Sequence, residues 1–291
     1  MSVAASLSFA SPPSVLTAYL KILFSRKPRI MEGEVPSLEG SLTGIRIRRG
    51  HLARYLSVCG EPAGSGVPIA FPHVLATPLH LGMLSSDLFP LNLLGVVHTR
   101  NRIVQRRPLT PDDIADIYAR ISGDKVTERG QELRLQTEAR VRGETIWAET
   151  STLLARASNQ RPARVTADGA GAAAERTDLR QQNFDVSPRT IRRYARVSGD
   201  YNPIHLSHSL ARLFGLKRAI AHGMWSLARC AAALGPKCFA SPCTMDVIFK
   251  APVPLSSEVT LRSWSSAQST GFELRDARGV RGHLRGTVSP A

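Results

Sequence analysis

Cysteine is scarce in this sequence. The 291 residues contain four cysteines, and no two of them form a Cys-x-x-Cys pair; they are Cys59, Cys230, Cys238 and Cys243. Such spacing excludes the usual zinc sites and a framework of disulfides. It fits reduced thiols and predicts a cytoplasmic protein.

Long hydrophobic runs are also missing. No segment reaches the roughly 20 uninterrupted apolar residues of a transmembrane helix, so we expect no stable membrane insertion. The N-terminus is apolar, but two prolines interrupt it and its basic residues follow the apolar part, unlike a signal peptide. We expect residues 1–40 to be an N-terminal extension, with a short helix that packs Leu16, Leu20 and Leu23 against the body of the protein.

Negative charge is in the minority. The chain has 38 Lys and Arg against 23 Asp and Glu, a formal net charge of +15 at pH 7. A positive protein attracts phosphate-bearing or acidic partners. However, no basic run is interleaved with aromatic residues, and no helix-turn-helix, zinc-finger or RNA-recognition pattern is present. We therefore predict no nucleic-acid binding.

The chain carries an internal duplication. Its length and its 43% hydrophobic and 21% charged residues suit a folded protein of one large or two ordinary domains. The segment YLSVCGEP, from Tyr55, resembles YARVSGDY, from Tyr194, and RGQELRL, from Arg129, resembles TGFELRD, from Thr270. The offset between the copies is nearly constant, which indicates the same unit twice.

Each copy has the pattern of a helix followed by strands. In the second copy, residues 219–235 are rich in alanine and leucine and are stopped by Gly235 and Pro236, as expected for a buried helix. Four short β-rich runs follow, separated by Ser, Gly and Pro, and the first copy shows the same order. The predicted architecture is α+β, a long helix wrapped by an antiparallel sheet, twice over.

One loop combines residues that a plain surface turn does not need. The stretch SGDYNPIHLSHS, residues 198–209, contains Asp200, Asn202 and His205 beside a glycine and a proline. Gly, Pro, Asn and Asp are ordinary turn residues, whereas a turn does not require the histidine. Taken separately, Asp200 and Asn202 also fit a helix cap, and His205 fits a hydrogen-bonded structural histidine. Together, a carboxylate and an imidazole on a loop stiffened by Pro203 can hold one water molecule from two sides.

This loop resembles a known signature. The segment YARVSGDYNPIH, followed by AHGM at 221–224, is similar to the signature of the MaoC-like dehydratases, the (R)-specific enoyl-CoA hydratases with the hot-dog fold. The segments AFPHVL and GVVHTRN resemble the amino-terminal repeat of double hot-dog members. The resemblance implies a double hot-dog fold, with a catalytically degenerate repeat at 41–157, a linker at 158–184 and a repeat carrying the hydratase motif at 185–291.

The same resemblance implies the chemistry. Asp200 and His205 would hold the water, the backbone N–H of Gly223 would stabilise the enolate oxygen, and Asn202 would support the loop. The first repeat has no Asp-x-Asn-x-x-His, so we expect it to be inactive, with Glu61 and His73 structural.

Several alternatives stay open at this stage. A hot-dog acyl thioesterase or a non-catalytic acyl-thioester-binding subunit would use the same fold. His208 and His222 invite a metal hypothesis, but the sequence around them shows no cysteine or carboxylate that completes a ligand set, so we predict no metal and no cofactor. The expected partner is an acyl thioester of coenzyme A or acyl carrier protein in fatty acid metabolism; homodimer formation is left open.

Overall fold

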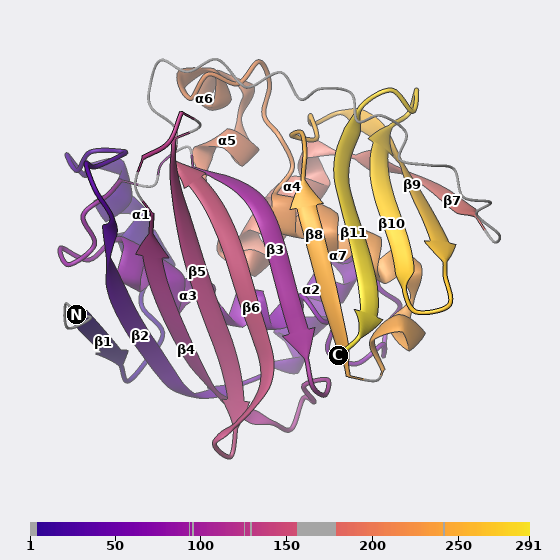
Figure 1. Cartoon of the computed structure of the whole chain (residues 1–291), viewed down its shortest axis with the longest axis horizontal. Coiled ribbons are helices and arrows are strands. Elements are labelled where there is room, and N and C mark those ends of the chain that lie inside the picture. The colour runs from indigo at the N-terminus through magenta and orange to yellow at the C-terminus, as the bar shows by residue number, and fades with distance from the viewer. Residues whose placement is uncertain are drawn as a thin grey trace.

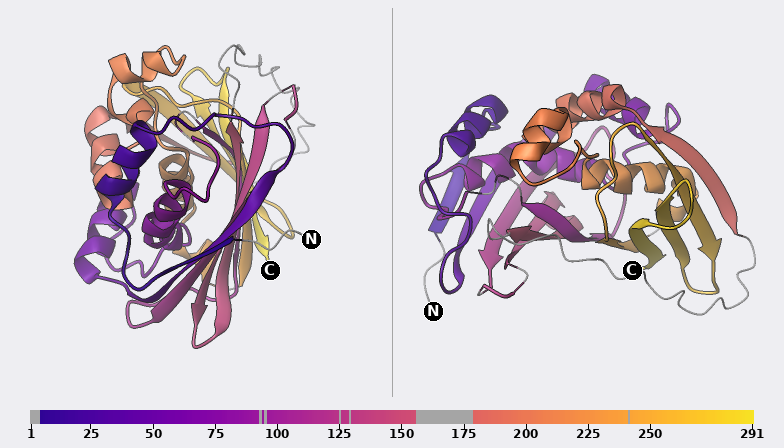
Figure 2. Two further views of the ribbon diagram at one scale, coloured as in Figure 1. Left: turned by 90° about the vertical axis from the view of Figure 1, so that its left-hand side faces the viewer. Right: turned by 90° about the horizontal axis from the view of Figure 1, so that it is seen from above.

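The fold is a single large sheet with helices on one face. The computed structural model describes residues 5–92, 94, 96–124, 126–128, 130–155, 179–240 and 242–291. Figures 1 and 2 show the curved sheet and the helices gathered against one side of it. None of the helices in these ranges is long and apolar enough to cross a membrane.

The first half supplies six strands and three helices of the described chain. The strands are β1 (Ala5–Phe9), β2 (Val35–Arg46), β3 (Val97–Gln105), β4 (Ile114–Gly123), β5 (Gln131–Val141) and β6 (Glu144–Ala155), and the helices are α1 (Val15–Leu23), α2 (Arg49–Cys59) and α3 (Phe71–Leu84). The predicted order of a helix followed by strands is confirmed in this half, with α3 as the helix and β3 to β6 as the strands.

The second half repeats the pattern. Its strands are β7 (Arg180–Val186), β8 (Cys243–Phe249), β9 (Ser257–Ser265), β10 (Thr270–Asp276) and β11 (Gly282–Pro290). Its helices are α4 (Pro188–Ser198), α5 (Pro203–Leu206), α6 (His208–Leu213) and α7 (Gly223–Leu234), followed by a 3-10 turn at Pro236–Phe239. Helix α7 ends before Gly235 and Pro236, as the sequence predicts.

The strand order is mirrored about its middle. The sheet runs β1-β2-β4-β5-β6-β3-β8-β11-β10-β9-β7. The order β2-β4-β5-β6-β3 in the first half corresponds to β7-β9-β10-β11-β8 in the second, and the halves join where β3 pairs antiparallel with β8. Only β1, parallel to β2, has no counterpart among the described strands. The duplication seen in the sequence is therefore present in the topology.

Two of the predicted domain limits fall inside strands. Strand β2 begins at Val35 and continues past residue 40, and β7 begins at Arg180, within the expected linker. Residues 158–178 of that linker lie outside the described residues. The division of the chain into 1–40, 41–157, 158–184 and 185–291 stays a prediction. Its limit after residue 40 divides β2, and its limit after residue 184 divides β7.

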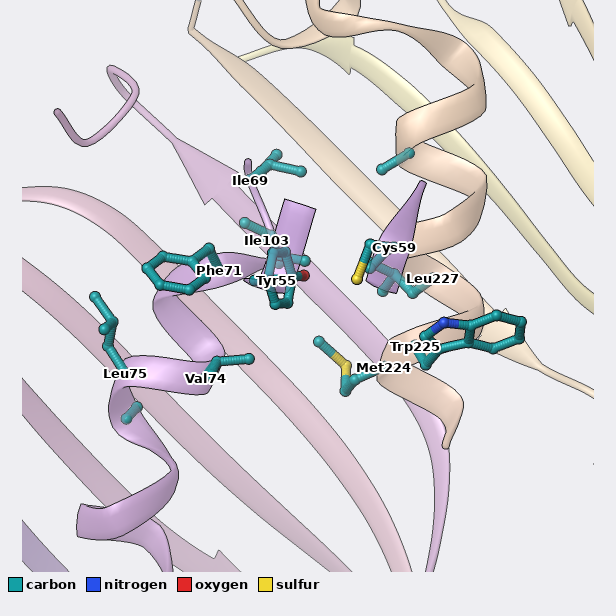
Figure 3. Packing of buried hydrophobic residues seen from close by; sticks show 14 of the residues in the cluster. Tyr55, Cys59, Ile69, Phe71, Val74, Leu75, Ile103, Met224, Trp225 and Leu227 are labelled. Atoms are coloured by element: carbon teal, nitrogen blue, oxygen red, sulfur yellow. The ribbon is translucent and has the colours of Figure 1, made fainter. Parts of the chain in front are cut away.

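The helices of the two halves share one core. Figure 3 shows Tyr55, Phe71, Met224 and Trp225 packed around a common centre. The Tyr55 and Phe71 rings meet edge to face, with centroids 5.0 Å apart. Trp225 is 2% exposed, and its indole N–H donates to the carbonyl of Val58 in the other half over 3.1 Å. Burial of one such aromatic side chain contributes about 2–3 kcal/mol, so this shared core holds the two halves together.

Helix α1 forms as predicted but buries a different face. Its N-cap Ser14 accepts from the Thr17 N–H. The leucines expected inside are exposed, with accessible fractions of 71% for Leu16, 48% for Leu20 and 51% for Leu23. Ala18 and Ile22 are buried instead, against Leu81 of α3. The helix has apolar residues at helical spacing on two faces, and the face with the small Ala18 is the one that fits closely against α3.

Candidate active site

The motif loop is built by three consecutive capping devices. Helix α4 ends at Gly199, whose left-handed φ of 76° turns the chain. The backbone N–H of Asn202 donates to Asp200 Oδ1 over 3.1 Å. The side chain of Asn202 then caps α5, accepting from the Ile204 N–H, and Pro203 occupies the first turn. These contacts fix the loop, and they give Asn202 a supporting position.

A cavity lies against this loop. It has a volume of about 310 Å³ and is lined by residues of both halves of the chain. The predicted residues Asp200, Asn202, His205 and Gly223 all line it, together with Tyr19, His73, His80 and His98 from the first half. The structure therefore brings the predicted site residues together, beside polar groups of the other repeat.

Asp200 and His205 face each other without a direct hydrogen bond. His205 Nδ1 lies 2.9 Å from the carbonyl oxygen of Ile220. A carbonyl can only accept, so Nδ1 carries the proton and Nε2 of the neutral ring is an acceptor. This Nε2 is 3.9 Å from Asp200 Oδ2. Two acceptors at that separation are suited to a water molecule that donates one hydrogen to each.

His222 supports the pair from the other side. Its Nε2 lies 2.9 Å from the backbone oxygen of Asp200, and its ring stacks on His205 with centroids 3.9 Å apart. Its buried Nδ1 has no hydrogen-bond partner among the described residues. His222 thus holds the backbone of Asp200, the residue whose carboxylate faces His205.

The electrostatics keep Asp200 ionised and the histidines neutral. Burial opposes ionisation of Asp200, but the facing imidazoles of His222 and His205, the Asn202 N–H and the Tyr19 hydroxyl outweigh it and lower the pKa to about 2. Burial lowers the pKa of His205, and burial together with His205 lowers the pKa of His222 to about 3. The hydrogen bonds from Asn202 and Tyr19 lower the pKa of Asp200 whether or not the two rings are charged.

Tyr19 is a site residue that sequence reasoning missed. Its hydroxyl donates to Asp200 Oδ1 over 2.9 Å, from a position 181 residues earlier in the chain. Its ring meets Tyr201 edge to face, with centroids 6.2 Å apart. Burial and the adjacent carboxylate raise the pKa of the Tyr19 hydroxyl, so it remains a donor. Helix α1 is therefore part of the wall of the site.

Gly223 is the first residue of α7 and lines the cavity. The first N–H groups of a helix have no partner within it, and the helix dipole adds positive potential there. A Cβ at this position would lie 3.3 Å from the ring of Phe249. A glycine here leaves room for a group to approach the N–H.

The same position in the first repeat cannot act this way. Ile69 and Ala70 precede Phe71 and Pro72, just as Ile220 and Ala221 precede His222 and Gly223. Proline has no backbone N–H to donate.

The structure groups a different set of possible metal ligands from the predicted His208 and His222. The prediction overlooked that Asp200 lies beside His222, because the sequence separates them. One donor atom each from Asp200, His205 and His222 can be chosen so that all lie within 4.8 Å of one another. A tetrahedral zinc site places its ligand atoms about 3.4 Å apart, and Asp200 Oδ2 is 3.9 Å from Nε2 of each histidine. His208 is used elsewhere, since its Nδ1 accepts from the Ala219 N–H. That the protein binds no metal stays a prediction.

His73 lies in the cavity wall and not only in the scaffold. Its Nδ1 is 2.7 Å from Glu149 Oε2. The carboxylate of Glu149 has no exposed side-chain surface, and its other oxygen accepts from Asn101 Nδ2 over 2.6 Å. Sequence reasoning missed Glu149. The available signal was an acidic residue on the inward face of β6, between Trp147 and Ser151.

Comparison with known proteins gives a consistent result. Residues 170–285 match the family model of the MaoC-like domain. The chain is 28% identical, over 257 residues, to 3-hydroxyacyl-thioester dehydratase X of Mycobacterium tuberculosis, covering 88% of this chain and 90% of the relative.

Solved structures agree with this match. The crystal structure of HtdX of Mycobacterium tuberculosis superposes with a TM-score of 0.73 at 28% identity, over 87% of this chain and 100% of that chain. A conserved hypothetical protein of the same organism, described as having a double hot-dog fold, gives a TM-score of 0.52 at 13% identity, over 90% of this chain and 96% of that one, which bears on the fold alone.

Proposed function

The chain belongs to the MaoC-like dehydratases and has their double hot-dog fold, and from this premise we propose that it catalyses the reversible hydration of trans-2-enoyl thioesters to (R)-3-hydroxyacyl thioesters. The observation that carries the proposal is the 3.9 Å separation of two acceptors, Asp200 Oδ2 and His205 Nε2. That arrangement orients a water molecule, and the relative of known name is a 3-hydroxyacyl-thioester dehydratase.

The proposed hydration proceeds through an enolate. The water oxygen bonds to C3, and His205 Nε2 accepts the proton that the water loses. The electron pair of the C2–C3 double bond moves onto the thioester oxygen, where the Gly223 N–H donates a hydrogen bond. The imidazolium then returns the proton to C2, so that hydrogen is added at C2 and hydroxyl at C3. Dehydration is the reverse sequence. General acid–base catalysis is typically worth about 10²–10⁴-fold.

The Asp200 carboxylate has two tasks in this scheme. It accepts a hydrogen bond from the second hydrogen of the water, and it stabilises the imidazolium that forms on His205. A low pKa suits both tasks, because the carboxylate must stay ionised while a positive charge develops beside it. The (R) configuration is the part of the proposal that rests on the family resemblance, and chiral analysis of the product tests it.

One spectroscopic experiment separates the candidate activities. A trans-2-enoyl thioester is incubated with the enzyme, and the ultraviolet band of the conjugated double bond and the free thiol are followed together. Loss of the band without thiol is the expected result. Release of thiol would instead indicate a thioesterase, and binding with neither change would indicate a non-catalytic subunit. Coenzyme A and acyl carrier protein thioesters are compared, because the net charge of +15 suits both carriers.

A further inference from the structure

The first repeat contributes an ion pair to the cavity that the hydration scheme does not use. His73 and Glu149 are paired over 2.7 Å. Both Glu149 oxygens are engaged, one by His73 and one by Asn101. With Nδ1 turned to the carboxylate, Nε2 is the remaining polar atom of the His73 ring, and this ring lines the cavity.

The pairing with Glu149 favours a proton on that remaining atom. Burial disfavours the charged ring, but the carboxylate of Glu149 more than offsets it and raises the pKa of His73. At Glu149, burial alone would raise the pKa of the carboxyl, but the nearby His73 outweighs burial and the pKa is lowered. Both directions favour an imidazolium beside a carboxylate, and an imidazolium carries a proton on each nitrogen. When the ring is charged, Nε2–H donates a hydrogen bond to the group that occupies the cavity, and when the ring is neutral Nε2 accepts one.

The cavity connects this pair to the reacting loop. His73, His98, Gly223 and Phe249 line the same cavity. The Phe249 ring is 3.3 Å from the Cβ position at Gly223, and its centroid is 4.9 Å from that of His98. Asp200 adds to the electrostatic potential at both His73 and His98. An acyl chain held with its thioester at Gly223 would thus extend toward the first repeat and reach the His73 ring.

The surrounding wall shows what kind of chain fits. Apolar side chains of the first half also line the cavity, among them Ile22, Leu81, Leu94, Leu135 and Leu153. Against a plain hydrocarbon the Nε2–H would lose water and gain no acceptor, which is costly for a charged donor. The ion pair is neutral overall, so it offers one hydrogen bond and no net charge for an anion. A neutral oxygen on the acyl chain meets both conditions.

We propose that His73, held by Glu149, is a specificity subsite for acyl chains that carry a hydroxyl or carbonyl oxygen beyond the reacting C2–C3 bond. The inference rests on the proposed function for the position of the thioester. The subsite binds substrate and takes no part in the proton transfers at Asp200 and His205.

The first experiment uses the wild-type protein. Hydration of trans-2-hexenoyl-, octenoyl- and decenoyl-CoA is compared with that of the same thioesters bearing a terminal hydroxyl. For at least one chain length we expect kcat/KM to be about tenfold or more in favour of the hydroxylated substrate, the usual effect of a hydrogen bond from a charged donor. Equal or lower values at all three lengths would overturn the subsite. A preference confined to terminal carboxylates would do so as well.

A binding measurement separates this result from the activity itself. Calorimetry with the saturated octanoyl-CoA and 8-hydroxyoctanoyl-CoA needs no turnover. If the protein hydrates none of the enoyl thioesters, the proposed function fails, while tighter binding of the hydroxylated compound still supports the subsite. Hydration without any preference in rate or binding removes the subsite and leaves the proposed function intact.

Two variants locate the effect. H73F/E149Q removes both members of the pair, so that no buried charge is left alone. H80F is the matched control, because His80 lines the same wall on the same helix, with its ring 5.6 Å from that of His73. We expect the preference to disappear in H73F/E149Q, with kcat/KM for plain chains unchanged or raised, and to persist in H80F. Loss of the preference in both variants, or a fall of more than 100-fold on plain chains in folded H73F/E149Q, would contradict a specificity role for His73.

Discussion

The hydroxyl of Tyr19 donates a 2.9 Å hydrogen bond to Oδ1 of Asp200, which leaves Oδ2 facing His205 and His222 at 3.9 Å. The carboxylate is thus divided between two tasks. One oxygen is anchored by Tyr19 and the Asn202 N–H, and the other is directed toward the imidazole that shares the water. The anchoring contact comes from helix α1, outside both predicted repeats.

Y19F tests this anchor. Without the donor the pKa of Asp200 rises, so the acid limb of the pH profile of kcat/KM moves to higher pH. We expect kcat/KM at neutral pH to fall about 10-fold or more. Y201F is the control, since it removes a neighbouring hydroxyl that is not one of the donors described at Asp200 and keeps both rings. An unchanged profile in Y19F would mean that the tyrosine only fills space.

D200N and H205A test the water site. Each removes one of the two acceptors, and each should reduce hydration by at least about 10²-fold. Circular dichroism and thermal melting, measured on the same samples, show whether the fold is kept. A folded variant of either kind with a wild-type rate would rule out the Asp200–His205 pair.

G223P and G223A together test the oxyanion donor. Proline is tolerated in the first turn of a helix and has no N–H, and the preceding His222 already has the extended backbone, with ψ of 136°, that proline favours. Loss of a comparable donor costs about 3–4 kcal/mol of transition-state stabilisation. G223A keeps the N–H and adds only a Cβ, 3.3 Å from Phe249. We expect kcat to fall more than 100-fold in G223P and far less in G223A; similar rates for the two would place the donor elsewhere.

Acid stability provides a test that needs no substrate. Buried histidines with lowered pKa stay neutral in the folded state while the unfolded chain binds protons below about pH 6.5. Burial lowers the pKa of His98 to about 4, so its contribution to stability is present above pH 6.5 and is lost as the pH falls toward 4. H98F should flatten the pH dependence of the unfolding free energy in this range by at most about 1.4 kcal/mol per pH unit. Chemical denaturation at several pH values measures the slope, and an unchanged slope would exclude His98 as a contributor.

The sequence was sufficient for the parts of the site that lie close together along the chain. Asp200, Asn202 and His205 lie on one short loop, where turn and capping chemistry act locally. Gly223 follows at the start of a helix that is rich in alanine and leucine and so could be predicted. The duplicated pattern likewise predicted the α+β architecture, and the mirrored strand order confirms it.

Contacts between distant segments were out of reach. Tyr19 meets Asp200 only because α1 docks on α3, and the apolar pattern of α1 allowed two docking faces. Strand β2 was cut at residue 40, where glycine weakens the strand signal; a Cβ at Gly40 would lie 2.6 Å from Met83 Sδ, so packing against α3 requires the glycine there. His73 was taken as structural because its partner Glu149 is 76 positions away.

The two repeats lie in one chain, and the pairing of β3 with β8 joins them in one continuous sheet. In a symmetric homodimer every substitution appears in both subunits, so a change that reshapes one site also alters the other. A single gene for two linked copies removes that constraint. Pro72 can stand in one copy while Gly223 remains in the other, and His73 and Glu149 can be introduced without placing a second ion pair beside Asp200. Covalent linkage thereby allowed one copy to diverge in its side chains while the other kept its reacting groups.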